Sequence, residues 1–203
     1  MKRILSTGLL LALVMMICAC GKTENQMKPE DTIIKFSEAM NAFNIAEMDE
    51  CFVPSTEKSV FDLGIEDEFG EQLVLKIQEW SKQIQYEVIS VSEDGYNAEV
   101  VVKYTYADAK PVAAEFMADY ITQAVTAAYG RASDEELDRM ALDILTDKLR
   151  SVPVESTEKY VGYSLEKVDN EWKIVEMPDE AVDVLTADFI VAFEVLSAAL
   201  EKN

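Results

Sequence analysis

Residues 96–106 read YNAEVVVKYTY, and this stretch decides the fold. Apolar or aromatic side chains occupy every second position, while Glu99 and Lys103 fall on the other side of the alternation. A period of two predicts a β-strand with one buried face and one face in water, so Glu99 should point to solvent. The run 86–91 predicts a preceding strand, and the turn residues Glu93-Asp94-Gly95 between the two runs predict a hairpin.

Helical periodicity flanks this hairpin on both sides. Pro29-Glu30-Asp31 is a typical helix start, with proline in the first turn and acids near the positive end of the helix dipole. The capping box Ser133–Glu136 opens another helix. We expect helices at 29–43, 45–52, 67–82, 111–130, 133–149 and 179–200, and strands at 86–91, 96–106, 154–168 and 172–177. The order predicts an α+β fold with an antiparallel sheet, two helices inserted between its strands and a C-terminal helix, all in one domain, 29–203.

The expected helix over 179–200 is apolar around much of its circumference. Asp183, Asp188 and Glu194 are the acids that interrupt it. An all-round apolar helix is either deeply buried or presents one face to a partner or to a second copy of the chain. The pattern leaves both alternatives open.

The amino terminus carries an export signal. Lys2 and Arg3 precede the uncharged, mostly apolar run 4–17. A spanning helix needs about 20 apolar residues, so this run is short and is typical of a signal-peptide core.

A cysteine ends this signal. Ile17-Cys18-Ala19-Cys20 resembles the lipobox of bacterial lipoprotein precursors, in which a branched residue and a small residue precede the lipidated cysteine. The resemblance implies cleavage between Ala19 and Cys20, a diacylglyceryl thioether on Cys20, and removal of residues 1–19. Cys18 fits the pattern less well, because the large Met16 precedes it by two positions. Residues 20–28 then form the lipidated end and a polar tether.

The negative net charge of the chain excludes some classes of binding partner. The chain has 39 acidic and 18 basic residues and a formal charge of −21. Loss of Lys2 and Arg3 with the signal would leave 16 basic residues and a charge of −23. Such a domain cannot neutralise phosphates, so we expect no nucleic-acid binding. An anionic lipid surface would repel it, so we expect the lipid anchor alone to contact the membrane.

The absence of histidine and the small number of cysteines exclude several kinds of catalytic and metal site. The chain has no histidine and three cysteines, of which Cys51 alone would stay free. The usual general base, Ser-His or Cys-His pairs and a Cys/His zinc site are therefore excluded, and we expect no enzyme, no cofactor and no metal. The acid clusters 66–68 and 134–138 lack the order of a calcium loop and are better explained as solvated helix starts.

Several aromatic side chains fall on the expected strands. Tyr86, Tyr104, Tyr106 and Trp172 either pack in the core, since strands favour aromatic residues, or line a pocket for a small apolar ligand. These four are the candidate ligand-binding residues of the sequence.

The arrangement of elements resembles a known fold family. Three segments carry the resemblance: PEDTIIKFSEAMNAFNIAEMDECF (29–52), YNAEVVVKYTYADAKPVAAEFMADYITQAVTAAYG (96–130) and VDNEWKIVEMPDE (168–180). They resemble lipid-anchored domains of the nuclear-transport-factor-2-like fold in a variant with a helical insertion. The resemblance implies a curved antiparallel sheet wrapped by helices around a cone-shaped pocket, and a Gram-positive source. Most such domains have no known function, and no catalytic motif can be transferred to this chain.

These observations lead to one expected function and two alternatives. We expect a lipoprotein at the extracytoplasmic face of the cell membrane, whose non-catalytic domain binds an envelope protein or a small apolar ligand. The first alternative is an isomerase- or dehydratase-type enzyme that uses a buried carboxylate and a tyrosine. The second is a structural or docking subunit that forms a homodimer through the C-terminal helix.

Overall fold

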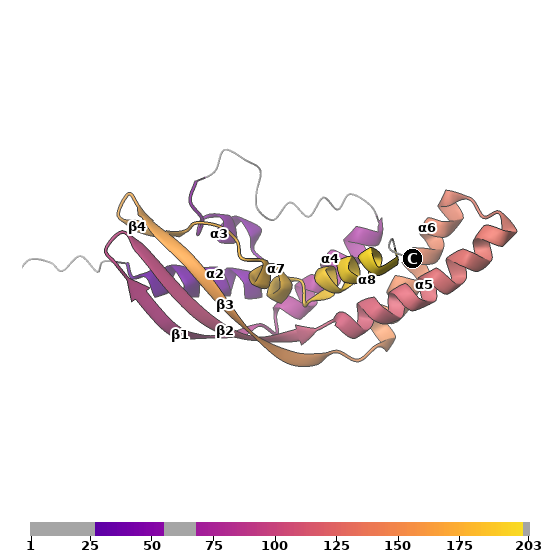
Figure 1. The fold of residues 1–203 in the computed structure, drawn as a ribbon, viewed down its shortest axis with the longest axis horizontal. Helices are drawn as coiled ribbons and strands as arrows, with labels where there is room; N and C mark the ends of the chain where they lie inside the picture. Colours follow the sequence, from indigo (N-terminus) through magenta and orange to yellow (C-terminus); the bar gives the residue numbers. More distant parts are fainter. Residues whose placement is uncertain (1–26, 55–67, 201–203) are drawn as a thin grey trace, which may run out of the picture.

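The protein is described by a computed structural model that covers residues 27–54 and 68–200. Within these residues, four strands form one open antiparallel sheet in the order β1-β2-β3-β4, accompanied by seven helices (Figure 1). The strands are β1 (Gln85–Glu93), β2 (Asn97–Asp108), β3 (Glu155–Val168) and β4 (Glu171–Ile174). The helices are α2 (Pro29–Ala42), α3 (Ile45–Asp49), α4 (Glu68–Ser81), α5 (Lys110–Gly130), α6 (Asp134–Ser151), α7 (Asp179–Leu185) and α8 (Phe189–Leu200). The predicted α+β class and the antiparallel sheet are confirmed.

The central strand β2 has the predicted alternation. Val100, Val102 and Tyr104 are fully buried, whereas Glu99, directly before Val100, is exposed. β1 pairs with β2 in the predicted hairpin. Gly95 in its turn has a φ of 96°, a conformation that L-residues with a side chain rarely adopt.

β3 and β4 complete the sheet through a tight turn. β3 pairs with β2 along the whole of β2, from Asn97↔Glu166 to Asp108↔Glu155. Asp169 and Asn170 connect β3 to β4 with φ angles of 49° and 72°, as a two-residue hairpin turn of the primed type requires. The expected strands end at 168 and resume at 172, and the turn that this gap implies is found at Asp169-Asn170.

The predicted helix over 45–52 is too long. α3 ends at Asp49, and the chain then bonds to the end of β4: the N–H of Ile174 donates to the carbonyl of Cys51, and the N–H of Val53 donates to the carbonyl of Ile174. Phe52 and Ile174 form a parallel bridge. Backbone hydrogen bonds at the sheet edge therefore replace the last helical turn.

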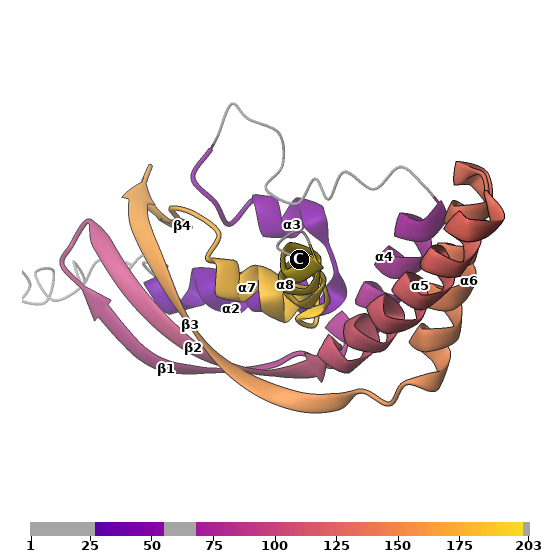
Figure 2. The same cartoon turned by 45° about the vertical axis from the view of Figure 1, so that its right-hand side comes forward.

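A main core fills the inner face of the sheet. α2 and α7 lie against that face in both views (Figures 1 and 2). Its large, fully buried side chains include Phe36, Met40, Tyr104, Tyr106, Tyr163, Leu165 and Trp172. The ring of Phe36 meets Phe52 and Tyr163 edge-on, with centroids 5.5 and 5.7 Å apart.

A second core lies among helices. α5 and α6 form an antiparallel pair that extends beyond the sheet, which we call the helical arm (Figure 2). α4, α8 and the arm enclose Leu73, Ile77, Trp80, Val112, Phe116, Leu145 and Phe189. The two helices predicted between the strands thus form a core of their own.

The predicted single helix over 179–200 is wrong. α7 ends at Leu185 and α8 begins at Phe189, so three residues separate them. Ala187 and Asp188 have φ angles of 56° and 58°, in the left-handed region. α7 consequently packs in the main core, and α8 packs in the second core.

We expect Phe36→Ala to destabilise the protein by about 3–5 kcal/mol, because it removes a ring with no exposed surface and leaves a cavity among Phe52 and Tyr163. Urea unfolding followed by circular dichroism measures the change. Tyr160→Ala, which removes a ring that is 60% exposed, is the matched control and should change the free energy of unfolding by less than about 0.5 kcal/mol. Equal effects of the two variants would contradict the assignment of the core.

Candidate functional site

Three of the four candidate ligand-binding residues lie inside the main core. Tyr104, Tyr106 and Trp172 are at most 2% exposed. Tyr86 is half-buried and its hydroxyl donates to Glu38 over 3.4 Å. A ligand-binding role for these residues stays a prediction. The lipobox residues Ile17, Cys18, Ala19 and Cys20 and the signal peptide lie outside the described residues.

Tyr104 belongs to a chain of buried hydroxyls. Its hydroxyl lies 2.8 Å from Ser37 Oγ and 2.9 Å from the hydroxyl of Tyr163. Burial raises the pKa of Tyr104 to about 12 and outweighs the hydrogen bonds from Ser37 and Tyr163, which lower it. These three hydroxyl groups are therefore uncharged at neutral pH, and their hydrogen bonds join α2 to β2 and β3 across the main core.

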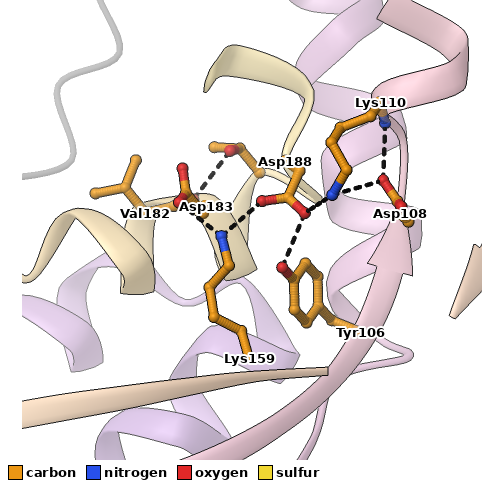
Figure 3. Close-up of polar contacts among 8 residues, drawn as sticks. Tyr106, Asp108, Lys110, Lys159, Val182, Asp183 and Asp188 are labelled. Carbon is orange, nitrogen blue, oxygen red and sulfur yellow. Dashed lines mark hydrogen bonds and ion pairs between the residues drawn. The ribbon is translucent and has the colours of Figure 1, made fainter. Parts of the chain in front are cut away.

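Tyr106, two residues further along β2, belongs to a second, charged cluster. Six side chains form it, and we call them the hinge cluster: Tyr106, Asp108, Lys110, Lys159, Asp183 and Asp188 (Figure 3). They come from the end of β2, the start of α5, the middle of β3, α7 and the break between α7 and α8. The cluster thus joins the elements of both cores.

Asp188 is the centre of the hinge cluster and is only 1% exposed. One carboxylate oxygen accepts a hydrogen bond from Lys159 at 2.8 Å. The other accepts from the Tyr106 hydroxyl at 2.9 Å and from the Lys110 ammonium. Lys159 also pairs with Asp183 at 2.7 Å, and Lys110 pairs with Asp108 at 3.1 Å.

The donors keep Asp188 charged. Burial alone would raise the pKa of Asp188, but the hydrogen bonds from Lys110, Lys159 and Tyr106 outweigh it and hold the pKa below its usual value. Burial likewise opposes the charge of Lys159, yet the hydrogen bonds to Asp183 and Asp188 raise its pKa. Burial and the neighbouring carboxylate Asp188 raise the pKa of Tyr106 far above its usual range. Asp188, Lys110 and Lys159 are therefore all ionised at neutral pH.

The backbone at the cluster is strained. Left-handed conformations at Ala187 and Asp188 cost roughly 1–2 kcal/mol per residue. Backbone hydrogen bonds fix the bend: the N–H of Asp188 donates to the carbonyl of Asp183 at 2.7 Å, and the N–H of Ala109 donates to the carbonyl of Ala187 at 2.8 Å. The bend places the side chain of Asp188 between the two lysines (Figure 3).

The hinge cluster is closed. Among the described residues, every buried side-chain nitrogen and oxygen has a hydrogen-bond partner. The hollows that described residues line lie between α5 and α6, between α4 and α6, and beside the start of α7, and no hinge-cluster residue lines any of them. A carboxylate with a lowered pKa is a weak base, and Tyr106, Lys110 and Lys159 already donate to this one.

Metal binding and thiol chemistry are the other two kinds of site that the described residues could form. In the described ranges, no group of three or more Asp, Glu or Cys side chains is placed to hold a metal ion. Cys51 is 2% exposed, and burial raises its pKa to about 11. This thiol is therefore neutral and inaccessible as a nucleophile at neutral pH.

The sequence interpretation missed Asp188, Lys110 and Lys159 as partners. The sequence around Asp188 carried no signal for these contacts, because its three donors lie on other elements. Lys159 carried none, since it sits on a strand 29 residues away and its pairing depends on where α7 packs.

Between residues 27 and 54 and between 68 and 200, none of the helices combines the length and the apolar character that crossing a bilayer requires.

The fold and the cluster define an α+β protein whose antiparallel sheet core and helical arm are joined by a closed, buried ion cluster. The chain belongs to the family described as "Domain of unknown function (DUF5105)", whose model matches residues 34–190. No curated protein matches the chain.

One similar solved structure is YcdA, a candidate lipoprotein of Bacillus subtilis subsp. subtilis strain 168. The two chains are 20% identical, with a TM-score of 0.42. The match covers 76% of this chain and 44% of YcdA, so this chain spans less than half of that protein.

We expect Asp188→Asn to lower the free energy of unfolding at pH 7 by about 3 kcal/mol, because it leaves two lysines without their buried counter-charge. The pKa of Asp188 is lowered by folding, so its contribution is present above the pKa of the unfolded chain, about 3.9, and is lost as the pH falls through the folded-state value. The difference between wild type and variant should therefore shrink below about pH 4.

Urea unfolding between pH 3 and pH 7 measures this difference. Glu158→Gln is the matched control: it breaks the pair with Lys103 at 2.7 Å, in which the Glu158 side chain is 56% exposed. This control should show no measurable change at any pH. A pH-independent difference for Asp188→Asn would contradict the ionised state of Asp188.

Proposed function

We propose that this protein is a lipoprotein held at the extracytoplasmic face of the cell membrane by lipid on Cys20, with a non-catalytic domain that binds an envelope protein. The basic n-region, the apolar run 4–17 and the lipobox-like Ile17–Cys20 support the address. The charge of −21 supports a domain that stands off an anionic membrane surface.

The closed hinge cluster is the observation that carries the non-catalytic assignment. An enzyme with a buried carboxylate and a tyrosine needs both groups beside a space for the substrate. Asp188 and Tyr106 are such a pair, but they bond to each other at 2.9 Å and line none of the described hollows. The lowered pKa of Asp188 also opposes its use as a base.

We further propose that the sheet is a nuclear-transport-factor-2-like cone whose interior is filled by its own side chains. α2 and α7 lie on the inner face of the sheet (Figure 2), and Tyr104, Tyr163 and Trp172 are fully buried there. A partner therefore has to bind on the outside of the molecule.

The helical arm is the surface that supports partner binding best. A groove of about 420 Å³ runs between α5 and α6, with the apolar side chains of Met140 and Ile144 in its lining. The acids Asp119, Glu136, Asp143 and Asp147 line it together with a single arginine, Arg139. On α5, Val125 and Tyr129 are 54% and 88% exposed. Apolar groups within an acidic rim fit a protein segment with apolar and basic side chains.

The lipid anchor is tested by Cys20→Ser. We expect labelled palmitate to be incorporated into the wild-type chain and to be lost in the variant, because the thioether forms on this sulfur. Cys18→Ser is the matched control and should keep the label. Unchanged incorporation in Cys20→Ser would overturn the proposed anchor.

The arm is tested by a photo-reactive phenylalanine analogue placed at Tyr129 or, as a matched aromatic control, at Tyr160 on the outer face of the sheet. Both residues are well exposed, at 88% and 60%. After irradiation of living cells we expect a discrete cross-linked species from position 129 and none from position 160.

A charge reversal in the groove gives a second test of the same surface. Asp143→Lys reverses a charge in the groove and should abolish the species from position 129, whereas Glu99→Lys on the sheet should not. Equal cross-linking from both positions, or persistence with Asp143→Lys, would overturn the assignment of the arm. A species with the mass of two chains would instead support the homodimer.

A further inference from the structure

The break between α7 and α8 is unusual for its sequence. Residues 179–200 contain neither glycine nor proline, the residues that normally end a helix. Ala187, in the middle of the break, is the best helix former of all, yet it has a φ of 56°. Local sequence therefore favours one continuous helix, and contacts from elsewhere must impose the bend.

Those contacts converge on one carboxylate. Asp188 receives all its side-chain hydrogen bonds from outside the helical segment: from Tyr106 at the end of β2, from Lys110 at the start of α5 and from Lys159 on β3. A continuous helix would move Asp188 away from these donors, because the two left-handed residues set its direction.

The part beyond the bend packs on one side only. α8 covers the second core through Phe189 and through Phe193, whose ring centroid lies 6.2 Å from that of Phe116 on α5. Its other side is open: Val195 is 64% exposed. Phe189 also covers Trp80, with ring centroids 6.4 Å apart.

We propose that Asp188 is a latch that holds residues 179–200 in a strained, bent form, and that its release joins α7 and α8 into one helix and withdraws α8 from α5. Release then uncovers Phe116 and Trp80, so α8 is a removable cover of the second core. Lys110, whose side chain is 49% exposed, is the part of the latch that an anionic group of a partner can reach.

The straight form has a distinct hydrogen-bond signature. In the bent form the first intrahelical bond of α8 runs from the N–H of Ala192 to the carbonyl of Asp188, so the amides of Ile190 and Val191 precede the hydrogen-bonded part. In a continuous helix both amides would bond to carbonyls four residues earlier. The N–H of Ala109, which donates to Ala187 at 2.8 Å in the bent form, would lose its partner.

Asp188→Ala in the full-length chain tests the latch, because it removes the carboxylate and favours the helical backbone. We expect the amides of Ile190 and Val191 to exchange with deuterium about tenfold or more slowly, and the amide of Ala109 to exchange faster. Acrylamide should quench Trp80, now uncovered, while Trp172 in the main core, 2% exposed, stays protected.

Asp188→Gly is the matched control. It removes the same carboxylate, but glycine adopts the left-handed conformation readily and disfavours a helix interior, so the bend should persist. Trp80 should then stay protected, and the amides of Ile190 and Val191 should keep their fast exchange.

Three outcomes would overturn the latch. The first is wild-type exchange and quenching in Asp188→Ala, and the second is identical behaviour of the alanine and glycine variants. Asp188→Ala could expose both tryptophans because it fails to fold, and Lys110→Gln then replaces it as the test. Lys110→Gln removes one donor to Asp188. It should change the exchange rates and the quenching of Trp80 in the same directions, by a smaller factor. Unchanged rates in Lys110→Gln would be the third such outcome.

Discussion

The carboxylate of Asp188 lies where the two cores of the protein meet, and a buried charge must have partners there. Its donors come from the end of β2, the start of α5 and β3, which are three separate parts of the chain. Satisfying them forces a bend that the local sequence does not favour. Because of that bend, α7 covers the sheet and α8 covers the arm, so one ion cluster divides a single apolar segment between two cores.

This division separates the buried polar chemistry from the accessible surface. The hydroxyl chain and the hinge cluster are both fully paired within the described residues, and they connect elements that are far apart in the sequence. Three of the four described hollows lie on and beside the helical arm, with acids and apolar groups in their lining. The interior therefore serves stability and shape, and the proposed binding of a partner takes place on the outside of the molecule.

Elements with a strong local pattern could be predicted from the sequence. The hairpin around Gly95, the turn at Asp169-Asn170 and the two arm helices were correct, because alternation, turn residues and the Ser133 cap act over a few neighbouring residues. The end of α3 was wrong because pairing with Ile174, far along the chain, replaced the last helical turn. The buried polar clusters could not be predicted, since each joins residues at least 59 positions apart or elements whose packing no local pattern specifies.

By itself, the sequence determined an antiparallel sheet with one solvent-exposed face and one buried face, two helices inserted between its strands, the second of them capped by Ser133, a high acidic charge and a lipobox-like amino terminus. Only the tertiary structure decided that Tyr104, Tyr106 and Trp172 are buried and that residues 179–200 bend at Asp188. The physical reason is the distance along the sequence over which each kind of interaction acts. Periodicity, caps and turns are set by hydrogen bonds and side chains within a few residues, whereas a buried carboxylate is stabilised by whichever distant lysines the folded chain brings to it.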